Sequence, residues 1–346
     1  MTAHSLTQIP AQQLPVTSPL EDLSLLLAAD MRSVNEVIMA RMVSEVPMIP
    51  QLAGYLIAAG GKRMRPLMTL ACAKLFVDEI GRAYGLAAAV EFIHTATLLH
   101  DDVVDESDQR RGQASANEIF GNQASVLVGD FLFSRAFELM VEGGSLEVLR
   151  ILSRASAIIA EGEVLQLSLQ NSLSTTLAQY ERVIAAKTAA LFAAACMVGP
   201  VIMGQGDELC RALYQYGHHV GMAFQIADDV LDYDSTTSDL GKSIGDDFKE
   251  GKITAPVIFA YQSAQENNDV EALDFWRKTI ERREFEDASD LPHAHDLMVK
   301  SGALNHTMEL AQDHVRRARA ALDICPPSNL KSILLDLAEF SVSRRK

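Results

Sequence analysis

The sequence has few cysteines, and the four that it has are scattered without a CxxC pair. Disulfide frameworks and cysteine-based zinc sites need thiols that are paired or regularly spaced along the chain. The pattern therefore disfavours both, and it predicts buried thiols in a reducing compartment. The four positions are Cys72, Cys196, Cys210 and Cys325.

Positive charge is also scarce, because 30 Lys and Arg stand against 46 Asp and Glu, which gives a formal net charge of −16. This balance disfavours nucleic acid and anionic membrane surfaces as general partners. An acidic protein that binds an anionic substrate must concentrate its few cations in one place. Local clusters of Lys and Arg are therefore informative in this chain.

The chain also lacks an apolar leader and a long apolar run. Its first twenty residues are polar and include Pro10, Pro15 and Pro19, so they do not resemble a signal peptide. No apolar run in the sequence is long enough to span a bilayer. We therefore expect a soluble, cytoplasmic protein without a membrane span.

Proline is missing between Pro66 and Pro200, and again between Pro200 and Pro256. Both stretches are rich in Ala, Leu, Met and Glu, which favour helices, and neither shows the alternating pattern of a strand. Apolar residues recur at helical spacing in five segments, namely 83–100, 124–141, 146–169, 177–198 and 209–231. Composition and periodicity thus predict an all-α fold.

The predicted organisation has two parts. Residues 1–20 form a flexible N-terminal arm, and residues 21–346 form one large helical bundle, since no linker divides them. Glycine and proline mark breaks between the helices, for example at Gly143-Gly144 and at Gly199-Pro200. The charged segment 270–292 contains the single tryptophan, Trp276, and is predicted to be a peripheral helix.

Two clusters of the form Asp-Asp-x-x-Asp lie within otherwise apolar sequence. Residues four apart on a helix face the same way, and packed carboxylates resist joint ionisation unless a cation lies between them. Carboxylates without Cys or clustered His select Mg²⁺ or Mn²⁺, and Mg²⁺ combines such ligands with substrate phosphates. The clusters therefore predict a cleft that holds a phosphorylated substrate through magnesium. They consist of Asp101, Asp102 and Asp105, and of Asp228, Asp229 and Asp232.

The scarce cations cluster in glycine-containing loops beside these aspartates. Glycine lets the backbone approach a phosphate, while Lys and Arg donate charge-assisted hydrogen bonds. Any one of these loops alone would be read as an ordinary solvated loop, but their joint arrangement favours a phosphate site. The loops are Gly60–Pro66, Arg110-Arg111-Gly112, Gly241-Lys242 and Gly251-Lys252.

The ordered set of motifs resembles all-trans polyprenyl diphosphate synthases, the long-chain branch of the isoprenyl diphosphate synthase family. The resemblance runs from about Gly60 to Pro256. It implies an isoprenoid synthase type of helical bundle around a deep central cavity, a homodimer, and Mg²⁺ as cofactor with Mn²⁺ as a substitute. The motifs that carry it are Gly60–Pro66, His94–Ser107, Arg110-Arg111-Gly112, Gly129-Asp130, Lys187-Thr188, Phe224–Asp232 and Gly241-Lys242.

The resemblance implies that an allylic diphosphate, such as farnesyl diphosphate, is joined to successive isopentenyl diphosphates by ionisation, condensation and proton loss. It implies metal ligands at Asp101, Asp105 and Asp228, supported by Asp102, Asp229 and Asp232. The allylic diphosphate would be held by Arg110, Lys187 and Lys242, with Thr188 and Gln225 beside the reacting carbons. Isopentenyl diphosphate would be held by Lys62, Arg65, His94 and Arg111, while Lys252 remains open.

Product length is predicted from the helical turn before the first aspartate cluster. Ala96 and Thr97 are small there, whereas short-chain members of the family place an aromatic residue at one of these positions. The product is therefore expected to be octaprenyl to decaprenyl diphosphate, as in the side chain of quinones such as ubiquinone. Nearby phenylalanines are candidate walls of the cavity or ordinary core residues, namely Phe92, Phe131, Phe133 and Phe137.

Three other functions are weighed. A shorter-chain synthase of the geranylgeranyl type differs only in product length. A class I terpene cyclase shares the metal chemistry but needs no isopentenyl site, so the cations around Lys62 argue against it. A non-catalytic synthase subunit can lose its aspartates, whereas all six are present in this chain.

Overall fold

The computed structural model describes residues 18–58, 61–110, 112–233, 245–284 and 286–343. The predicted all-α fold is confirmed, and the only strands in these residues are β1 (Gln109–Arg110) and β2 (Gln113–Ala114). The first helices are α1 (Pro19–Leu26), α2 (Ala28–Arg41), α3 (Met48–Ala58), α4 (Met64–Lys74), α5 (Gly81–Val104), α6 (Ala116–Phe120), α7 (Asn122–Glu142) and α8 (Leu146–Leu169). The remaining helices are α9 (Leu177–Ile184), α10 (Ala190–Ile202), α11 (Asp207–Leu231), α12 (Asp246–Glu250), α13 (Ala255–Glu266), α14 (Val270–Trp276), α15 (Asp287–Ser301), α16 (Ala303–Ala321) and α17 (Asn329–Ser343).

All five segments with helical periodicity are helices, and α8 has the predicted bounds. The break predicted at Gly199-Pro200 is wrong, because α10 continues to Ile202 with Pro200 buried inside it. Gly199 has a packing role instead, since a Cβ there would lie 2.5 Å from the carbonyl oxygen of Thr69 on α4. The glycine thus lets two helices approach closely and does not end one of them.

The N-terminal arm was predicted to extend to residue 20, but the first helix begins before that residue. Helix α1 begins at Pro19, and the hydroxyl of Ser18 caps it by accepting from the backbone N–H of Glu21. Leu20 is buried in the main hydrophobic core. The part of the predicted arm that remains, residues 1–17, lies outside the described residues.

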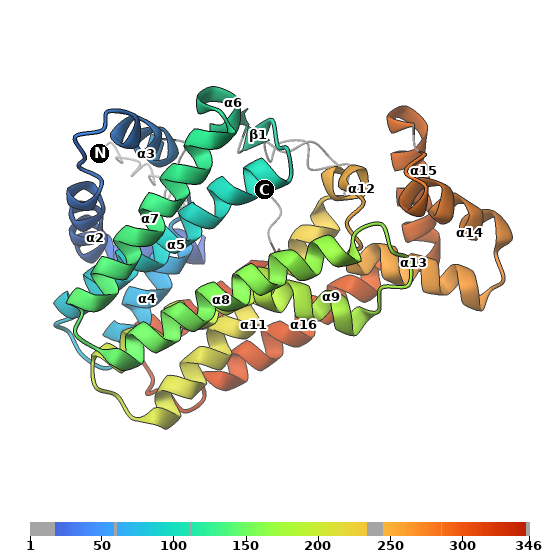
Figure 1. The fold of residues 1–346 in the computed structure, drawn as a ribbon. Helices are drawn as coiled ribbons and strands as arrows, with labels where there is room; N and C mark the ends of the chain where they lie inside the picture. The colour runs from blue at the N-terminus through green and yellow to red at the C-terminus, as the bar shows by residue number, and fades with distance from the viewer. Residues whose placement is uncertain (1–17, 59–60, 111, 234–244, 285, 344–346) are drawn as a thin grey trace, which may run out of the picture.

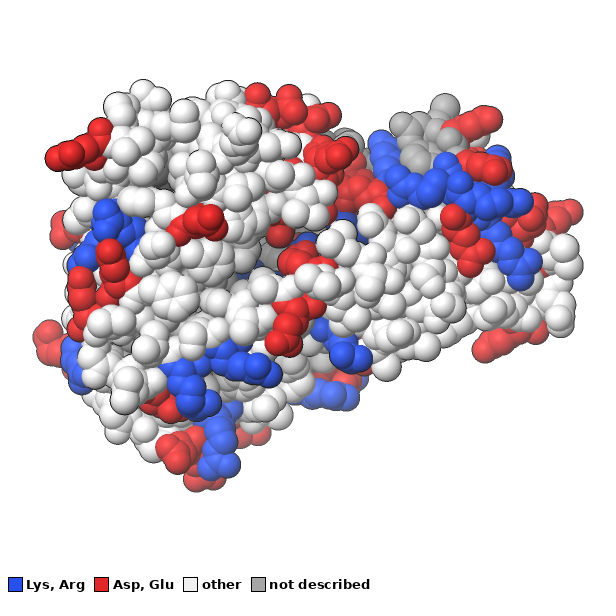
Figure 2. All heavy atoms as spheres, viewed as in Figure 1, with Lys and Arg blue, Asp and Glu red and all other residues white. Residues whose placement is uncertain are grey.

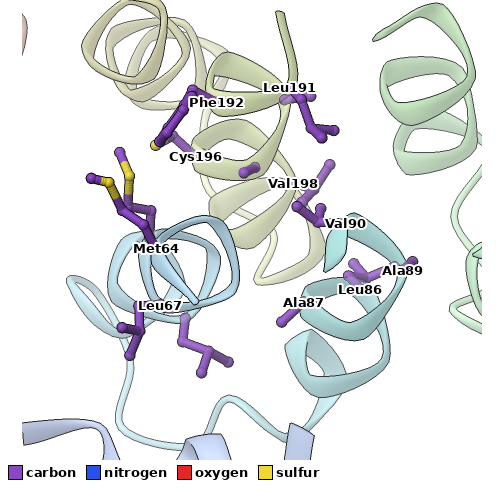
Figure 3. Close-up of a cluster of buried hydrophobic side chains, with 14 of the residues drawn as sticks. Met64, Leu67, Leu86, Ala87, Ala89, Val90, Leu191, Phe192, Cys196 and Val198 are labelled. Atoms are coloured by element: carbon purple, nitrogen blue, oxygen red, sulfur yellow. The ribbon is translucent and has the colours of Figure 1, made fainter. Parts of the chain in front are cut away.

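Helix α10 lies at the centre of the main core and contacts α4, α5, α8 and α11. Figure 3 shows its side chains Leu191, Phe192 and Cys196 beside Met64 of α4 and Val90 of α5. Helices α5 and α7 pack against each other, as do α11 and α16 (Figure 1). This packing holds the C-terminal ends of α5 and α11, which carry the two aspartate clusters.

Small residues set the spacing between α10 and α11. A Cβ on Gly217 would lie 2.4 Å from the carbonyl oxygen of Phe192, and one on Gly221 would lie 2.7 Å from Cα of Ala189. Both glycines lie on one face of α11, because residues four apart on a helix are neighbours. The two helices that present Lys187 and Gln225 are therefore in close backbone contact.

A second hydrophobic cluster includes residues of α13, α14 and α15, which project at one end of the molecule (Figure 1). The segment 270–292 is peripheral as predicted, but it is not one helix, because it contains α14, the π-helical segment η2 (Arg277–Glu281) and the start of α15. Trp276 is fully buried and packs edge-on against Phe248 at 6.4 Å. Its indole thus anchors a small separate core.

All four cysteines are buried and unpaired by disulfides, as the sequence predicts. One continuous helix, Leu177–Ile202, is apolar and long enough to cross a membrane by length and composition alone. The search for apolar runs missed it, because the helix is interrupted by polar residues such as Lys187. Within the protein, 78% of its most apolar window is buried, as in a core helix of a globular domain.

Candidate active site

The two aspartate clusters end two helices that the fold brings together. Asp105 is the C-cap of α5, and Asp232 is the C-cap of α11. Lys187 and Lys252 each contact the first cluster. The second cluster is reached from their neighbours, through Thr188 and Gln225 to Asp229 and through Asp247 to Asp232. Figure 2 shows Asp and Glu side chains gathered around a hollow near the middle of one face of the molecule.

Lys187 lies in the π-helical segment η1 (Ala185–Ala189), which interrupts the long helix between α9 and α10. Its Nζ lies 2.9 Å from a carboxylate oxygen of Glu163 on α8 and 3.9 Å from one of Asp101. Burial alone lowers the pKa of Lys187, but Asp101 and Glu163 raise it above its usual value. The lysine is therefore a largely buried cation held between two carboxylates.

Asp101 is mostly buried, with 16% of its side chain exposed. Burial raises the pKa of this carboxyl to about 6, Lys187 opposes the shift, and the carboxylates of Glu163 and Asp105 add to it. A carboxyl in this environment favours any cation that joins it, because the cation relieves both the burial and the repulsion.

Lys252 is a second buried cation, and it joins the first cluster to α12. Its ammonium lies 3.2 Å from Asp105 and 3.8 Å from Asp247, and it also pairs with Glu250. The backbone N–H of Asp247 in turn donates to Oδ2 of Asp232 at 3.1 Å. Burial lowers the pKa of Lys252, but the three carboxylates outweigh burial and raise it far above its usual value.

Asp229 accepts hydrogen bonds from two neutral side chains. The hydroxyl of Tyr180 donates to its Oδ2 at 2.6 Å, and Nε2 of Gln225 donates to its Oδ1 at 2.8 Å. Thr188 donates to Oε1 of Gln225 at 2.8 Å, which joins the neighbour of Lys187 to this network. Burial raises the pKa of Asp229 well above its usual value, and Asp247 adds to the shift.

The remaining aspartates differ in surroundings. Asp102 is 1% exposed and accepts from Nε of Arg110 at 2.6 Å, so this pair holds the first strand of the β1–β2 hairpin against α5. Asp228 is half-buried on the last turn of α11, one residue before Asp229. The hairpin at Arg110 was not predicted, since only a loop was expected there.

The cations predicted to hold isopentenyl diphosphate come from the start of α4 and from α5. Nη1 of Arg65 lies 3.1 Å from Nε2 of His94, and its guanidinium stacks on Phe192 with Cζ 4.2 Å from the ring centre. Lys62 is exposed just before α4. Arg111 and Lys242 lie outside the described residues, so their roles stay predictions.

A pocket with about 780 Å³ of empty space, part of it open solvent, adjoins these residues on α5. Its polar lining includes Arg63, Glu91 and His94, together with the Asp102–Arg110 pair. The apolar lining comes from α2, α3, α5 and α7, with Ile38, Met42, Leu56, Phe92, Leu98 and Leu132. The pocket can therefore take a molecule with an anionic head and a small apolar body.

The residues predicted to set product length lie inside the bundle. Ala96 is fully buried, and Thr97 is half-buried with its hydroxyl donating to the carbonyl oxygen of His94 at 2.8 Å. Phe92 is buried, which suits a wall or a core residue. Phe137 is 43% exposed on the outer face of α7, so its prediction as wall or core is wrong.

Sequence reasoning missed several partners of the site. Glu163 was not assigned to the site, yet it is the closest anion to Lys187 among the described residues. Tyr180 was not singled out, because its contact with Asp229 spans 49 positions and depends on how α9 packs against α11. Lys252 was left open, although its place after Gly251 and beside the second cluster was the available signal.

The residues fit a magnesium ion by the chemistry of their oxygens. Within the described ranges no set of three or more metal-ligating side chains is already arranged as a closed metal site. Mg²⁺ does not require one, because it combines one or two carboxylates with substrate phosphates and water. The ammonium of Lys252 held among carboxylates shows that this part of the cavity accommodates positive charge.

Comparisons with known proteins agree with this geometry. A family model described as polyprenyl synthetase matches residues 46–298. The octaprenyl diphosphate synthase of Escherichia coli is 43% identical over 94% of this chain and 99% of its own. A polyprenyl synthase structure from Caulobacter crescentus, complexed with calcium and isoprenyl diphosphate, is 51% identical with a TM-score of 0.90, and covers 94% of this chain and 98% of that one. A decaprenyl diphosphate synthase structure from Rhodobacter capsulatus is 49% identical with a TM-score of 0.89. The match covers 95% of this chain and 100% of that one.

Proposed function

The chain belongs to the polyprenyl synthetase family, and from that premise we propose how its cavity works and what its product serves. It is a prenyltransferase that makes a long-chain all-trans polyprenyl diphosphate. The product is an octaprenyl to decaprenyl diphosphate and serves as a quinone side chain, for example in ubiquinone. The observation that carries the assignment is that Asp101 and Asp105 of the first aspartate cluster lie against Lys187 and Lys252, while Asp247 links Lys252 to Asp232 of the second cluster.

Asp101, Asp105 and Asp228 hold Mg²⁺, for which Mn²⁺ can substitute. A metal held there would supply positive charge to offset the charge that develops on the departing diphosphate. The burial of Asp101 and the proximity of Asp105 support this role, since both carboxylates gain from a shared cation. The calcium and isoprenyl diphosphate in the relative from Caulobacter crescentus agree with a metal-dependent site.

The allylic diphosphate is held by Arg110, Lys187 and Lys242, and we add Lys252 to this group. Lys187 and Lys252 are buried cations whose partners are carboxylates, so both can turn to an anionic substrate without leaving the cavity. Breaking the allylic C–O bond leaves a carbocation and a diphosphate. Fixed cations aimed at the diphosphate lower that barrier, because they are already in place when its charge grows.

Thr188 and Gln225 stabilise the carbocation. Their hydrogen bond to each other, and that of Gln225 to Asp229, fix the dipoles of both side chains. Uncharged oxygens near a carbocation stabilise it without capturing it as a carboxylate would. The carbon–carbon double bond of isopentenyl diphosphate then attacks the cation, and the released diphosphate accepts the proton that the new chain loses.

Isopentenyl diphosphate is held by Lys62, Arg65, His94 and Arg111. It does not ionise, so cations suffice without a metal. The contact between Arg65 and His94 supports the assignment, because it joins the start of α4 to the face of α5 next to the aspartates. The growing tail passes the small residues Ala96 and Thr97, whose size leaves room for a long chain.

The protein acts as a homodimer in the cytoplasm. Support for a dimer comes from the outer face of α7, where Val126, Leu127, Phe137 and Val141 are exposed at 38%, 67%, 43% and 64%. An exposed row of large apolar side chains is typical of a surface that meets another chain. A second copy of the protein would also explain the position of Phe137.

The test combines activity with single aspartate changes. Purified protein is incubated with Mg²⁺, labelled isopentenyl diphosphate and farnesyl diphosphate, and the dephosphorylated prenols are sized by chromatography. Asp101→Asn and Asp228→Asn are each expected to lower kcat at least about 100-fold, as loss of a central electrostatic group does. Asp207→Asn, at an exposed position on the first turn of α11, is the matched control.

Near-normal turnover by either variant would overturn the metal assignment. A product that forms without isopentenyl diphosphate would point to a cyclase, and a product of twenty carbons would favour the shorter-chain synthase. Protein that is inactive unless another subunit is added would support the non-catalytic reading.

A further inference from the structure

Arg63 separates two residues assigned to isopentenyl diphosphate, Lys62 and Arg65, and has an unusual backbone. It is the N-cap of α4 with φ of 47° and ψ of 32°, which is the left-handed region. A residue with a side chain rarely adopts this conformation, and the surrounding structure must hold it there. The bend sets the direction in which the chain enters α4 and thus where Lys62 and Arg65 lie.

Glu91 of α5 holds the side chain of Arg63. Nη1 of Arg63 donates to Oε1 of Glu91 at 3.0 Å. Only 12% of the Glu91 side chain and 22% of the Arg63 side chain are exposed, so water screens the pair little. Both residues line the pocket beside α5.

The same face of α5 carries a second anchor for this turn. Glu91 and His94 are three residues apart on the helix and are therefore neighbours. Glu91 binds Arg63, while His94 lies 3.1 Å from Arg65. The turn is thus tied to α5 at two points, one on each side of Met64.

We propose that Glu91 is a positioning residue for isopentenyl diphosphate, acting through Arg63. It keeps Arg63 in its left-handed conformation and thereby keeps Lys62 and Arg65 directed at the same diphosphate. Glu91 does not touch the substrate itself, because a carboxylate repels a diphosphate and this one is neutralised by Arg63. The inference rests on the proposed isopentenyl site and goes beyond it by naming what holds that site in shape.

Glu91→Gln tests the proposal, because it removes the charge and keeps the shape. We expect the KM for isopentenyl diphosphate to rise about 10-fold or more, which is the scale of losing one charge-assisted hydrogen bond. The KM for farnesyl diphosphate should stay within twofold of the wild-type value. The melting temperature should stay within about 2 °C of the wild type. Glu271→Gln, an exposed glutamate on the first turn of α14, is the matched control.

Changes at Arg63 separate positioning from direct binding. Glycine adopts positive φ without strain. Arg63→Gly should therefore keep the left-handed backbone conformation without the ion pair to Glu91, whereas Arg63→Ala should lose that conformation. In the Glu91→Gln background, which leaves no unpaired carboxylate, Arg63→Gly should restore the KM for isopentenyl diphosphate toward the wild type. Arg63→Ala in the same background should not restore it.

Equal impairment of the two double variants would overturn the proposal, since it would mean that the guanidinium itself binds substrate. An unchanged KM in Glu91→Gln, or equal losses for both substrates with a lower melting temperature, would overturn it too. Lys62→Ala and His94→Ala report on the underlying site. If they leave the KM for isopentenyl diphosphate unchanged, the proposed site itself fails. If they raise it while Glu91→Gln does not, only this inference fails.

Discussion

Gly129 of α7 lies directly against His100 of α5, one residue before the first aspartate cluster. A Cβ on Gly129 would lie 2.2 Å from Nε2 and 2.6 Å from Cδ2 of His100. The imidazole is fixed on that side by a contact of 3.1 Å between Nε2 and the carbonyl oxygen of Val126. A single missing side chain thus allows α5 and α7 to pack where the active site begins.

We expect Gly129→Ala to lower the free energy of unfolding by about 1–2 kcal/mol, because His100 must move and lose its contact with Val126. Thermal or urea unfolding measures the change. Gly54→Ala in α3, where a Cβ meets nothing within 4 Å, is the control and should be neutral or slightly stabilising. Adding His100→Ala to Gly129→Ala should cost less than the sum of the two single changes, and strict additivity would contradict the steric account.

The π-helical segment η1 (Ala185–Ala189) positions two of the side chains that we propose to act on the allylic substrate. It carries Lys187 and Thr188 and packs against Gly162 of α8, where a Cβ would lie 2.5 Å from Cβ of Ala186. Such segments contain one residue more than the α-helix around them and are frequent at functional sites. The extra residue changes which side chains point into the cavity.

Deleting Ala186 should convert η1 into regular helix and cost activity while the fold remains. One residue turns an α-helix by about 100°, so the contacts of Lys187 and the Tyr180–Asp229 bond can no longer form together. We expect kcat to fall about 100-fold, as small displacements of catalytic groups do, with helical content unchanged by circular dichroism. The control is deletion of exposed Arg277 in the second π-helical segment, η2 (Arg277–Glu281). Equal losses in both deletions would show a general folding defect.

The sequence predicts helices well and interruptions of helices poorly. Apolar periodicity places α8 with its true bounds, because one face of that helix is buried along its length. The π-helical segment leaves no such signal, since Ala185 and Ala186 are as suited to an α-helix. Gly199 and Pro200 look like a break, and only the contact with α4 explains why the helix continues.

Some contacts of the candidate site could also be predicted from the sequence, and others could not. Spacing within one helix predicts that Asp101 and Asp105 lie together. The order of the motifs along the chain predicts that Lys187 belongs to the same site. Contacts between distant helices, such as Tyr180 with Asp229, depend on tertiary packing that a single sequence does not reveal. The cluster around Lys252 needs Asp105 and Asp247, which are far apart in the chain, to meet on one ammonium.

At the scale of the whole molecule, a histidine pair joins α11 to α16. Nδ1 of His219 lies 3.0 Å from Nδ1 of His314, and the rings are 5.2 Å apart. The pKa of each is lowered to about 4, chiefly by burial, with further lowering contributions from His218 and His314 on His219 and from Arg317 on His314. Asp313 opposes the shift in both. Both imidazoles are therefore neutral in the folded protein at neutral pH.

The pair predicts how stability depends on pH. Between pH 6.5 and about 4 these two histidines bind protons in the unfolded chain but not in the folded protein, so their contribution to the free energy of unfolding falls as pH falls through this range. Above pH 6.5 the contribution is constant. Urea unfolding at several pH values measures the slope, and the double variant His219→Asn with His314→Asn should flatten it. The variant His295→Asn controls for the loss of any histidine, and an unchanged slope in the double variant would contradict the prediction.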